Sequence, residues 1–277
     1  ATRLHEAGKE VTLLESCKEL GGRVSSQEVS GFTLDRGFQV FLSAYPESGK
    51  LLDLEALDLR PFRPGALIFR AGKFHRLMDV FRCPQFAIAT AAQPIGTLWD
   101  KLLVGKMRLQ ARIGPGLEQE DQPDSSTEDY LRNFGFSESM IDGFFRAFYG
   151  GIFLERDLRT SRRMFQFTFR MFATGHATVP AGGMQQIPQQ LANRLPPRTI
   201  RTSAKVCRVE SNRVVLANDE TVEADQVVVA TDAEATTRII PDFPERPVSW
   251  RSVTGLHFAA PRSPLNEAII ALNGESD

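Results

Sequence analysis

The segment from residue 11 to residue 24, VTLLESCKELGGRV, constrains the fold of this chain more than any other. Its apolar start predicts the end of a buried strand, and Glu15 follows where that strand stops. Dinucleotide-binding folds place a carboxylate at this position, where it accepts hydrogen bonds from a ribose diol. Gly21 and Gly22 lack a Cβ, so backbone N–H groups can approach a ligand closely. Arg23 offers a forked cation suited to a phosphate, and the segment therefore predicts a site for a nucleotide cofactor.

The sequence enters this pattern part-way through a strand–helix–strand unit. Residues 1–8 have a helical pattern that stops at Gly8, and residues 10–15 follow as a strand. In a dinucleotide fold, the glycine-rich phosphate turn lies about 20 residues before the acidic residue. Counting back from Glu15 places that turn just before Ala1. We therefore expect the sequence to be an internal fragment of a longer protein, with a G-x-G-x-x-G turn immediately upstream.

The composition narrows the class of protein. Hydrophobic residues make up 42% and charged residues 24%, as in an ordinary globular protein. The net charge of −1 gives no reason to expect nucleic acid as a partner. Three cysteines far apart in the sequence (Cys17, Cys83 and Cys207) predict neither disulfides nor a metal site, and they favour a reducing, cytoplasmic location. No segment reaches the roughly 20 apolar residues that span a bilayer, while a peripheral contact with a membrane stays open.

Glycine, proline and capping residues predict the remaining organisation. Strand-like alternation covers 31–42, a helix is expected over 47–59, and 66–76 predicts a hairpin that turns at Gly72. Three helices follow, from Ser125 or Ser126 to Gly135, from Ser137 to Gly150-Gly151, and over 161–173. Short strands alternate with turns from 199 to 230. The last of them, from Val227 to Ala230, predicts a buried parallel strand whose end faces a ligand.

Four segments of this sequence resemble the FAD-dependent amine oxidase superfamily, which includes phytoene desaturases, protoporphyrinogen oxidases and monoamine oxidases. The segments are LLESCKELGGRVSS, GFTLDRGFQVF, VPAGGMQQIPQQLANRL, and AKVCRVE with ADQVVVATDA. The resemblance implies an α/β fold with a Rossmann-like FAD-binding domain, built from three layers with a mostly parallel sheet and a β-meander. It also implies a second, α+β substrate domain. The expected boundaries are 1–62 and 176–245 for the FAD-binding domain, 63–175 for the helical substrate domain, and 246–277 for the start of its sheet.

The resemblance also assigns cofactor-binding residues by their positions in this sequence. Glu15 would bind the adenosine ribose, Arg23 the pyrophosphate region, and the backbone of Val206 the adenine. The remaining predicted contacts are small or polar residues at close approach, namely Gly21, Gly22, Gly37, Ala230 and Thr231. Members of the superfamily often have Ala-Arg after the strand-end Glu, whereas Ser16 and Cys17 stand here, so no polar contact is assigned to position 17. Because the phosphate turn is missing, we expect the 277 residues alone to bind FAD weakly and to be inactive.

The substrate pocket is predicted from aromatic residues and a glycine pair. Ten of the twenty Phe residues fall between Phe134 and Phe172, and their helical spacing is explained in large part by core packing. The density still favours a pocket for an apolar substrate. Its candidate residues are Phe148, Phe167, Gly182 and Gly183, although the glycine pair equally suits a plain helix start. For Asp35, a position near the flavin and a surface ion pair are equally supported, and neither His176 nor any other residue is assigned a catalytic role.

The predicted function is dehydrogenation of an apolar or amine-bearing small molecule by hydride-type transfer to the flavin N5, where the cofactor does the chemistry and the protein positions the substrate. One alternative is a non-catalytic binder of isoprenoid or lipid on the same fold, similar to the prenylated-GTPase dissociation inhibitors. Another alternative is a dehydrogenase that uses only NAD(P). The Gly-Gly-Arg after Glu15 favours FAD over both alternatives.

Overall fold

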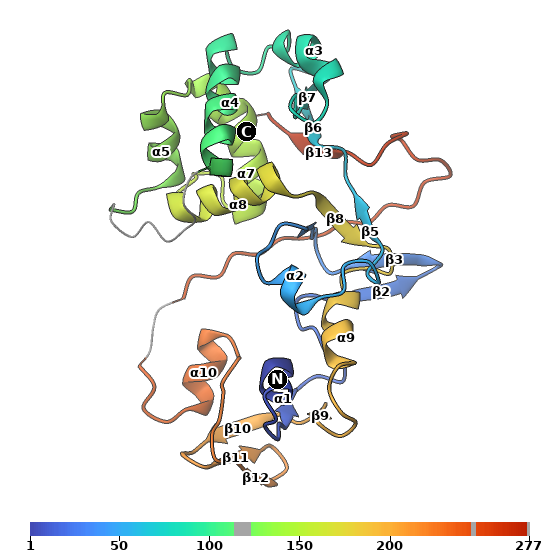
Figure 1. Ribbon diagram of the computed structural model, residues 1–277, viewed down its shortest axis with the longest axis vertical. Helices are drawn as coiled ribbons and strands as arrows, with labels where there is room; N and C mark the ends of the chain where they lie inside the picture. Colours follow the sequence, from blue (N-terminus) through green and yellow to red (C-terminus); the bar gives the residue numbers. More distant parts are fainter. Residues whose placement is uncertain (114–122, 245–247, 276–277) are drawn as a thin grey trace. The chain divides into compact units, whose positions relative to one another are not determined.

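The structure is a computed structural model that describes residues 1–113, 123–244 and 248–275. The chain divides into two units (Figure 1), of which the first comprises Ala1–Arg36 and Gly182–Trp250 and the second Gly37–Ala181 and Arg251–Asp277. Residues 37–62 and 176–181 thus belong to the second unit, although we expected them in the cofactor domain. The predicted domain boundaries themselves stay predictions.

The first unit combines short strands with three short helices. Its strands are β1 (Leu13–Leu14), β2 (Ser26–Val29), β3 (Phe32–Asp35), β9 (Ile200–Arg201), β10 (Val206–Val209), β11 (Arg213–Leu216) and β12 (Thr221–Glu223). Its helices are α1 (Thr2–Glu6), α9 (Gln186–Ala192) and α10 (Ala233–Ile239). β1 pairs in parallel with β9, β2 and β3 form an antiparallel hairpin, and β10, β11 and β12 form the expected meander. A small core of Ala204, Val214 and Leu216 lies beneath the meander.

The mostly parallel, three-layer sheet that we predicted for this unit is not found among the described residues, where β1 and β9 form its parallel pair. Residues 227–230, predicted as a buried strand, have no regular structure, and the side chain of Val228 is 75% exposed. A strand that is buried on both faces needs hydrogen-bonded neighbours, and no described segment pairs with these residues. These residues therefore have the apolar composition of a buried strand, but among the described residues they lack the hydrogen-bonded neighbouring strands that a buried strand needs.

The second unit contains two three-stranded sheets. β4 (Phe41–Leu42), β8 (Ala177–Pro180) and β5 (Leu59–Pro61) form an antiparallel sheet in that order. The other sheet places β6 (Gly65–Arg70) between β13 (Ile270–Asn273), which runs parallel to it, and β7 (Lys73–Met78), which runs antiparallel. The predicted hairpin is confirmed: Ala71 and Gly72 both have positive φ, as a two-residue turn between β6 and β7 requires.

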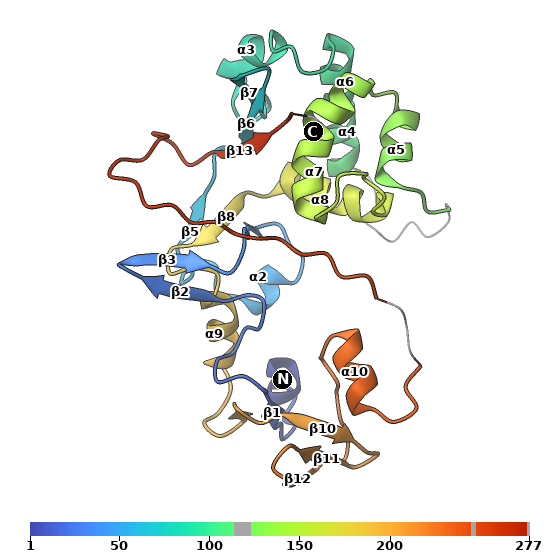
Figure 2. The ribbon, with the colours of Figure 1, turned by 180° about the vertical axis from the view of Figure 1, so that it is seen from behind.

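A layer of helices packs beside the β13–β6–β7 sheet (Figures 1 and 2). The helices of this unit are α2 (Ser48–Leu51), η1 (Pro84–Phe86), α3 (Ala87–Ala91), α4 (Leu98–Ile113), α5 (Thr127–Phe134), α6 (Glu138–Met140), the π-helical segment η2 (Ile141–Phe145), α7 (Arg146–Phe153) and α8 (Arg162–Thr174). The core between them is strongly aromatic, and Phe145, Tyr149 and Phe165 are at most 2% exposed. Within the described ranges, none of the helices combines the length and apolar character needed to cross a membrane.

The capping residues identified in the sequence begin and end these helices. The hydroxyl of Ser126 accepts the N–H of Asp129 at the start of α5, and Gly135 ends this helix in a left-handed conformation. Ser137 caps α6 in the same way, and Ser161 caps α8. The helix predicted over 47–59 is wrong in length, because Leu52 is already extended and α2 has only one turn. The acidic segment 117–126, whose proline and serine residues predict a loop, lies outside the described residues as far as residue 122.

Candidate cofactor turn and substrate cavity

Glu15 directly follows β1, where its backbone is held by the last residue of β9 and by the segment that follows β9. The N–H of Glu15 donates to the carbonyl oxygen of Arg201 at 2.9 Å, and its own carbonyl oxygen accepts the N–H of Ala204 at 2.8 Å. The carboxylate is oriented by its own turn, since Oε1 accepts the N–H of Cys17 at 2.8 Å and the hydroxyl of Ser16 at 3.2 Å. Among the described residues nothing donates to Oε2, which leaves an acceptor at the position where the sequence predicts a ribose diol.

The turn after Glu15 contains two glycines with different surroundings. Gly21 has φ of +109°, and a Cβ there would overlap the carbonyl oxygen of Val24 and lie 2.9 Å from Cγ of Pro188. Gly22 has φ of +57°, and a Cβ there would meet no atom within 4 Å. Packing within the unit therefore accounts for Gly21. It does not account for Gly22, whose backbone borders open space that a ligand can enter.

The glycine pair at 182–183 packs against the β2–β3 hairpin. A Cβ on Gly183, which has φ of +82°, would lie 2.5 Å from Oγ of Ser26 and 2.7 Å from Cγ2 of Thr33. Close packing thus explains this glycine, and Gly182 faces the side chain of Gln186. Both glycines belong to the first unit and lie outside the cavity described below.

Asp35 joins these two segments. Its Oδ1 accepts the hydroxyl of Ser26 at 2.5 Å and the backbone N–H of Met184 at 2.8 Å. The same hydroxyl oxygen of Ser26 accepts the N–H of Gln185 at 3.0 Å, and Nε2 of Gln185 donates to the carbonyl oxygen of Leu20 at 2.6 Å. The described bonds of Asp35 are those of a carboxylate that ties the start of α9 to the hairpin and, through Gln185, to the segment that precedes Gly21. They include no ion pair with an arginine, whereas a place beside the flavin stays a prediction.

The other predicted cofactor residues of this unit lie on neighbouring segments. Val206, Leu14 and Val227 pack on the same small core, which brings β10, the strand before Glu15 and the segment before Ala230 together. Ala230 is exposed, and the hydroxyl of Thr231 lies 2.9 Å from that of Thr236. The guanidinium of Arg23 lies 5.1 Å from the ring centroid of Trp250 and has further interactions. Gly37 belongs to the second unit, where a Cβ on it would lie 3.3 Å from Val253.

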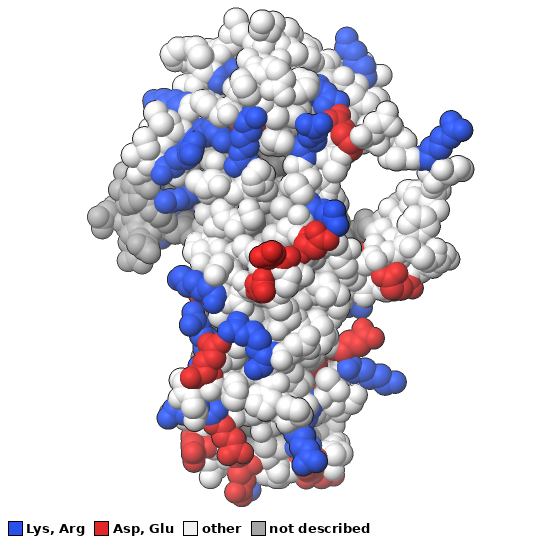
Figure 3. All heavy atoms as spheres, turned by 45° about the vertical axis from the view of Figure 1, so that its right-hand side comes forward, with Lys and Arg blue, Asp and Glu red and all other residues white. Residues whose placement is uncertain are grey.

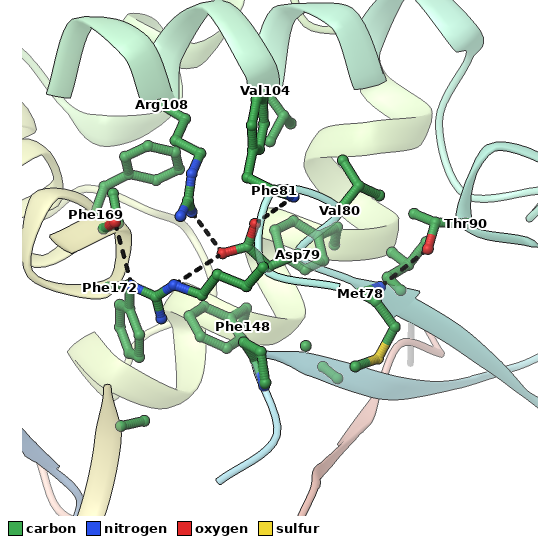
Figure 4. A pocket seen from close by; sticks show the side chains of 18 of the residues that line it. Met78, Asp79, Val80, Phe81, Thr90, Val104, Arg108, Phe148, Phe169 and Phe172 are labelled. Atoms are coloured by element: carbon green, nitrogen blue, oxygen red, sulfur yellow. Dashed lines mark hydrogen bonds and ion pairs between the residues drawn. The ribbon is translucent and has the colours of Figure 1, made fainter. Parts of the chain in front are cut away.

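The second unit contains a cavity of about 230 Å³, walled by the β6–β7 hairpin and by α4, α7 and α8. Phe148, Phe169 and Phe172 form one apolar wall (Figure 4), and Phe81 and Val104 lie across from them. Phe148 was predicted as a pocket residue, and the structure places it here. Phe167 lies outside the cavity and stacks on Tyr45 with ring centroids 6.0 Å apart.

Charged groups are concentrated on one side of this cavity. Oδ2 of Asp79 binds Nη1 of Arg108 at 2.6 Å and lies 3.6 Å from Nε of Arg82. Arg82 also donates to the carbonyl oxygen of Ala173 at 3.2 Å. Nζ of Lys101 donates to the carbonyl oxygens of Ala91 and Gln93, both at 2.8 Å. Burial lowers the pKa of Lys101 and that of Arg82, because it disfavours the charged form of each.

These charged residues were not predicted from the sequence. The available signal is their spacing, because Lys101, Gly105 and Arg108 stand at i, i+4 and i+7 and so share one face of α4. His176 and the buried Tyr149 also line the cavity, and burial raises the pKa of the Tyr149 phenol. No three His, Cys, Asp or Glu side chains come together as metal ligands in the described part of the chain.

Comparison with models of known families identifies one family. The model of the family described as flavin containing amine oxidoreductase matches residues 1–271. No protein of curated function matches the sequence. Among solved structures, putrescine oxidase bound to putrescine is 21% identical with a TM-score of 0.60, and the match covers 86% of this chain and 56% of the oxidase.

Two further solved structures share this architecture. Reduced UDP-galactopyranose mutase is 17% identical with a TM-score of 0.55, covering 88% of this chain and 55% of the mutase. The fatty acid isomerase from P. acnes that produces CLA is 16% identical with a TM-score of 0.56, covering 87% and 57% respectively. At these identities the likeness shows the fold, a mixed arrangement of helices and sheets. The chain spans a little over half the length of each of these proteins.

Proposed function

The chain belongs to the flavin-containing amine oxidoreductase family, and we propose that it forms part of an FAD-dependent oxidoreductase that dehydrogenates an apolar or amine-bearing small molecule. The observation that carries the proposal is the turn after β1. It combines an available carboxylate oxygen on Glu15 with open space at the backbone of Gly22. A member of the family that no longer bound a cofactor would not need either of these features.

The residues of the first unit fit the adenosine half of FAD. Oε2 of Glu15 is an acceptor with no donor among the described residues, as a ribose diol needs. The backbone of Gly22 can be approached by a phosphate without meeting a side chain, and Arg23 is next in the sequence. Leu14 and Val206 share one small core, so that the adenine and ribose contacts proposed for Val206 and Glu15 come from adjoining segments.

When bound, the flavin supplies the redox chemistry by accepting a hydride equivalent from the substrate. The chain's own residues bind the cofactor, orient the substrate and shield it from water. Asp35 and Ser26 hold the start of α9 against the β2–β3 hairpin, which keeps the Gly21-Gly22 turn in position through Gln185. In the second unit, the aromatic wall of the cavity excludes water from an apolar substrate.

The experiment is FAD retention by the full product of the gene. We expect the purified protein to be yellow and to release FAD on denaturation, and Glu15→Gln to weaken FAD binding about tenfold, a loss of ~1.4 kcal/mol. Glu19→Gln is the matched control, because Glu19 is an exposed carboxylate of the same turn. Equal FAD affinity in the two variants would contradict the role proposed for Glu15.

The two alternatives make different predictions in the same preparation. A lipid-binding protein on this fold would be colourless and would bind an isoprenoid lipid. A dehydrogenase that uses only NAD(P) would retain that nucleotide on reconstitution and would not retain FAD. Either result would replace the proposed function.

A further inference from the structure

The cavity of the second unit has more positive charge than its own residues neutralise. Asp79 binds Arg108 (Figure 4), and the same carboxylate lies 3.6 Å from the guanidinium of Arg82. Lys101 adds a third cation, which donates to two backbone carbonyl groups. The carboxylate that acts on its charge belongs to the neighbouring Asp100, which does not line the cavity. We infer that the cavity binds a molecule with an apolar body and one anionic group, such as a carboxylate. That this molecule is the substrate rests on the proposed function.

Arg108 is the residue best placed to receive the anion. Its side chain is 11% exposed, and its Nε is buried and donates to no acceptor among the described residues. Its guanidinium lies 5.1 Å from the ring centroid of Phe81, another apolar residue that lines the cavity. A buried cation with an unused donor is costly. A ligand carboxylate beside the part of this guanidinium that lines the cavity would supply the missing negative charge.

The other residues that line the cavity show whether its ligand is an anion or an amine. The apolar wall formed by Phe148, Phe169 and Phe172 accepts a hydrocarbon body of either kind. An alkylammonium group would enter beside Arg82, Arg108 and Lys101 with only Asp79 to receive it, and Asp79 already binds both arginines. The charges of the cavity therefore favour the anionic member of the two substrate classes that its apolar surface allows.

The test uses three probes that differ only in the terminal group: decanoate, decanol and decylamine. We expect the full chain to bind decanoate at least tenfold more tightly than decanol and decylamine. In Arg108→Gln, decanoate binding should fall to the level of decanol, with decanol binding unchanged, and Arg108→Lys should retain most of the preference. Lys106→Gln is the matched control, since Lys106 lies on α4 against the ring of Phe134 and does not line the cavity.

The outcomes separate this inference from the proposed function. Tighter binding of decylamine, or an equal loss of all three probes in a folded Arg108→Gln protein, would overturn the inference. FAD content is measured on the same samples. A yellow protein that prefers decylamine would support the proposed function and contradict the inference. A colourless protein that prefers decanoate would contradict the proposed function and support the inference.

The outward face of α4 carries a second, independent inference. Five large apolar side chains on this helix are between 59% and 75% exposed: Leu98, Trp99, Leu102, Leu109 and Ile113. At 100° per residue, four of them form one stripe and Trp99 lies beside it, with Lys106 and Arg112 on its flanks. The one carboxylate of the helix, Asp100, is buried on the opposite side. Lys and Arg gather on the part of the second unit seen in the upper half of Figure 3, with little Asp or Glu among them.

We propose that this stripe rests on a membrane surface that contains anionic lipids. Exposed apolar patches of this kind mark interaction sites. An apolar helix face with an aromatic residue and flanking cations is typical of a helix that lies in the headgroup region. The charges on its flanks complement anionic headgroups.

Sedimentation with lipid vesicles tests this proposal. We expect the full chain to bind phosphatidylcholine vesicles that contain phosphatidylglycerol, and Leu102→Ser with Leu109→Ser to reduce this binding at least tenfold. Phe258→Ser is the control, because Phe258 is exposed and distant from α4 in the sequence. Absence of vesicle binding, or an equal loss of vesicle binding in the control, would overturn the proposal. A stable wild-type dimer that becomes monomeric in the double variant would overturn it as well.

Discussion

Gly21 and Gly22 are adjacent residues with positive φ, and the structure predicts different outcomes when each is replaced by alanine. At Gly21, φ of +109° lies outside the left-handed region open to other residues, and a Cβ would overlap the carbonyl oxygen of Val24. Backbone strain costs about 1–3 kcal/mol, and overpacking against a fixed group adds about 1–3 kcal/mol. Gly21→Ala should therefore lower the free energy of unfolding by about 3–5 kcal/mol.

At Gly22 the corresponding cost is small. Its φ of +57° lies within the left-handed region, and a Cβ would meet no atom within 4 Å. Alanine in this conformation costs about 1–2 kcal/mol, part of which is offset because alanine also restricts the unfolded chain. We expect Gly22→Ala to lower the free energy of unfolding by about 1 kcal/mol or less. The new Cβ occupies the space proposed for the cofactor, so FAD affinity should fall at least tenfold.

Thermal unfolding and FAD titration of both variants separate the two effects. A change of 1 kcal/mol corresponds to roughly 2–4 °C in Tm for a chain of this size. Without added FAD, the Tm should fall by roughly 10 °C for Gly21→Ala and by no more than about 4 °C for Gly22→Ala. Equal losses of Tm would refute the steric reasoning. Unchanged FAD affinity in Gly22→Ala would remove the reason for placing the cofactor at this turn.

Three further variants test the packing of the units by urea unfolding. Asp100→Ala should cost about 3–5 kcal/mol at pH 7, because this buried carboxylate accepts four hydrogen bonds from Thr97 and Ser137. Burial alone would raise the pKa of Asp100, but these bonds lower it from its ordinary value. Asp100 therefore contributes its full share of the free energy of unfolding above the unfolded-state pKa, and it loses this share as the pH falls through the lower folded-state pKa. The stabilities of the variant and the wild type should therefore converge in acid. Asp35→Ala should cost about 2 kcal/mol and speed amide exchange at Met184, and unchanged exchange would contradict the bond from that N–H. Phe165→Ala should cost about 3–5 kcal/mol, against about 0.5 kcal/mol or less for the exposed Phe258→Ala; similar values would contradict the aromatic core.

Features set by neighbouring residues could be predicted from the sequence. The turn at Ala71 and Gly72 needs only two residues that accept positive φ between alternating strands. The helix starts at Ser126 and Ser137 need only a hydroxyl that reaches an N–H three residues on. Each of these signals acts within a few residues, and therefore the sequence predicts where the elements begin.

Features that depend on distant partners could not be predicted in this way. The apolar composition of 227–230 predicts a buried strand, but the pairing that makes a strand comes from other segments, and none of the described ones pairs with it. Asp35 binds a backbone N–H almost 150 residues later, so that its structural role is hidden from local patterns. The ion cluster of the cavity combines Asp79 with Arg108 from another element. For the site, the sequence therefore predicts the turn at Glu15 and the aromatic wall, but not the cations that face this wall.

The most direct test of the central claim is the FAD content of the purified full gene product, measured from its absorbance spectrum and from the nucleotide released on denaturation. The account predicts a flavin spectrum, close to one FAD per chain, and a marked loss of FAD in Gly22→Ala while the protein stays folded. A folded wild-type protein that neither carries nor takes up FAD would contradict the account.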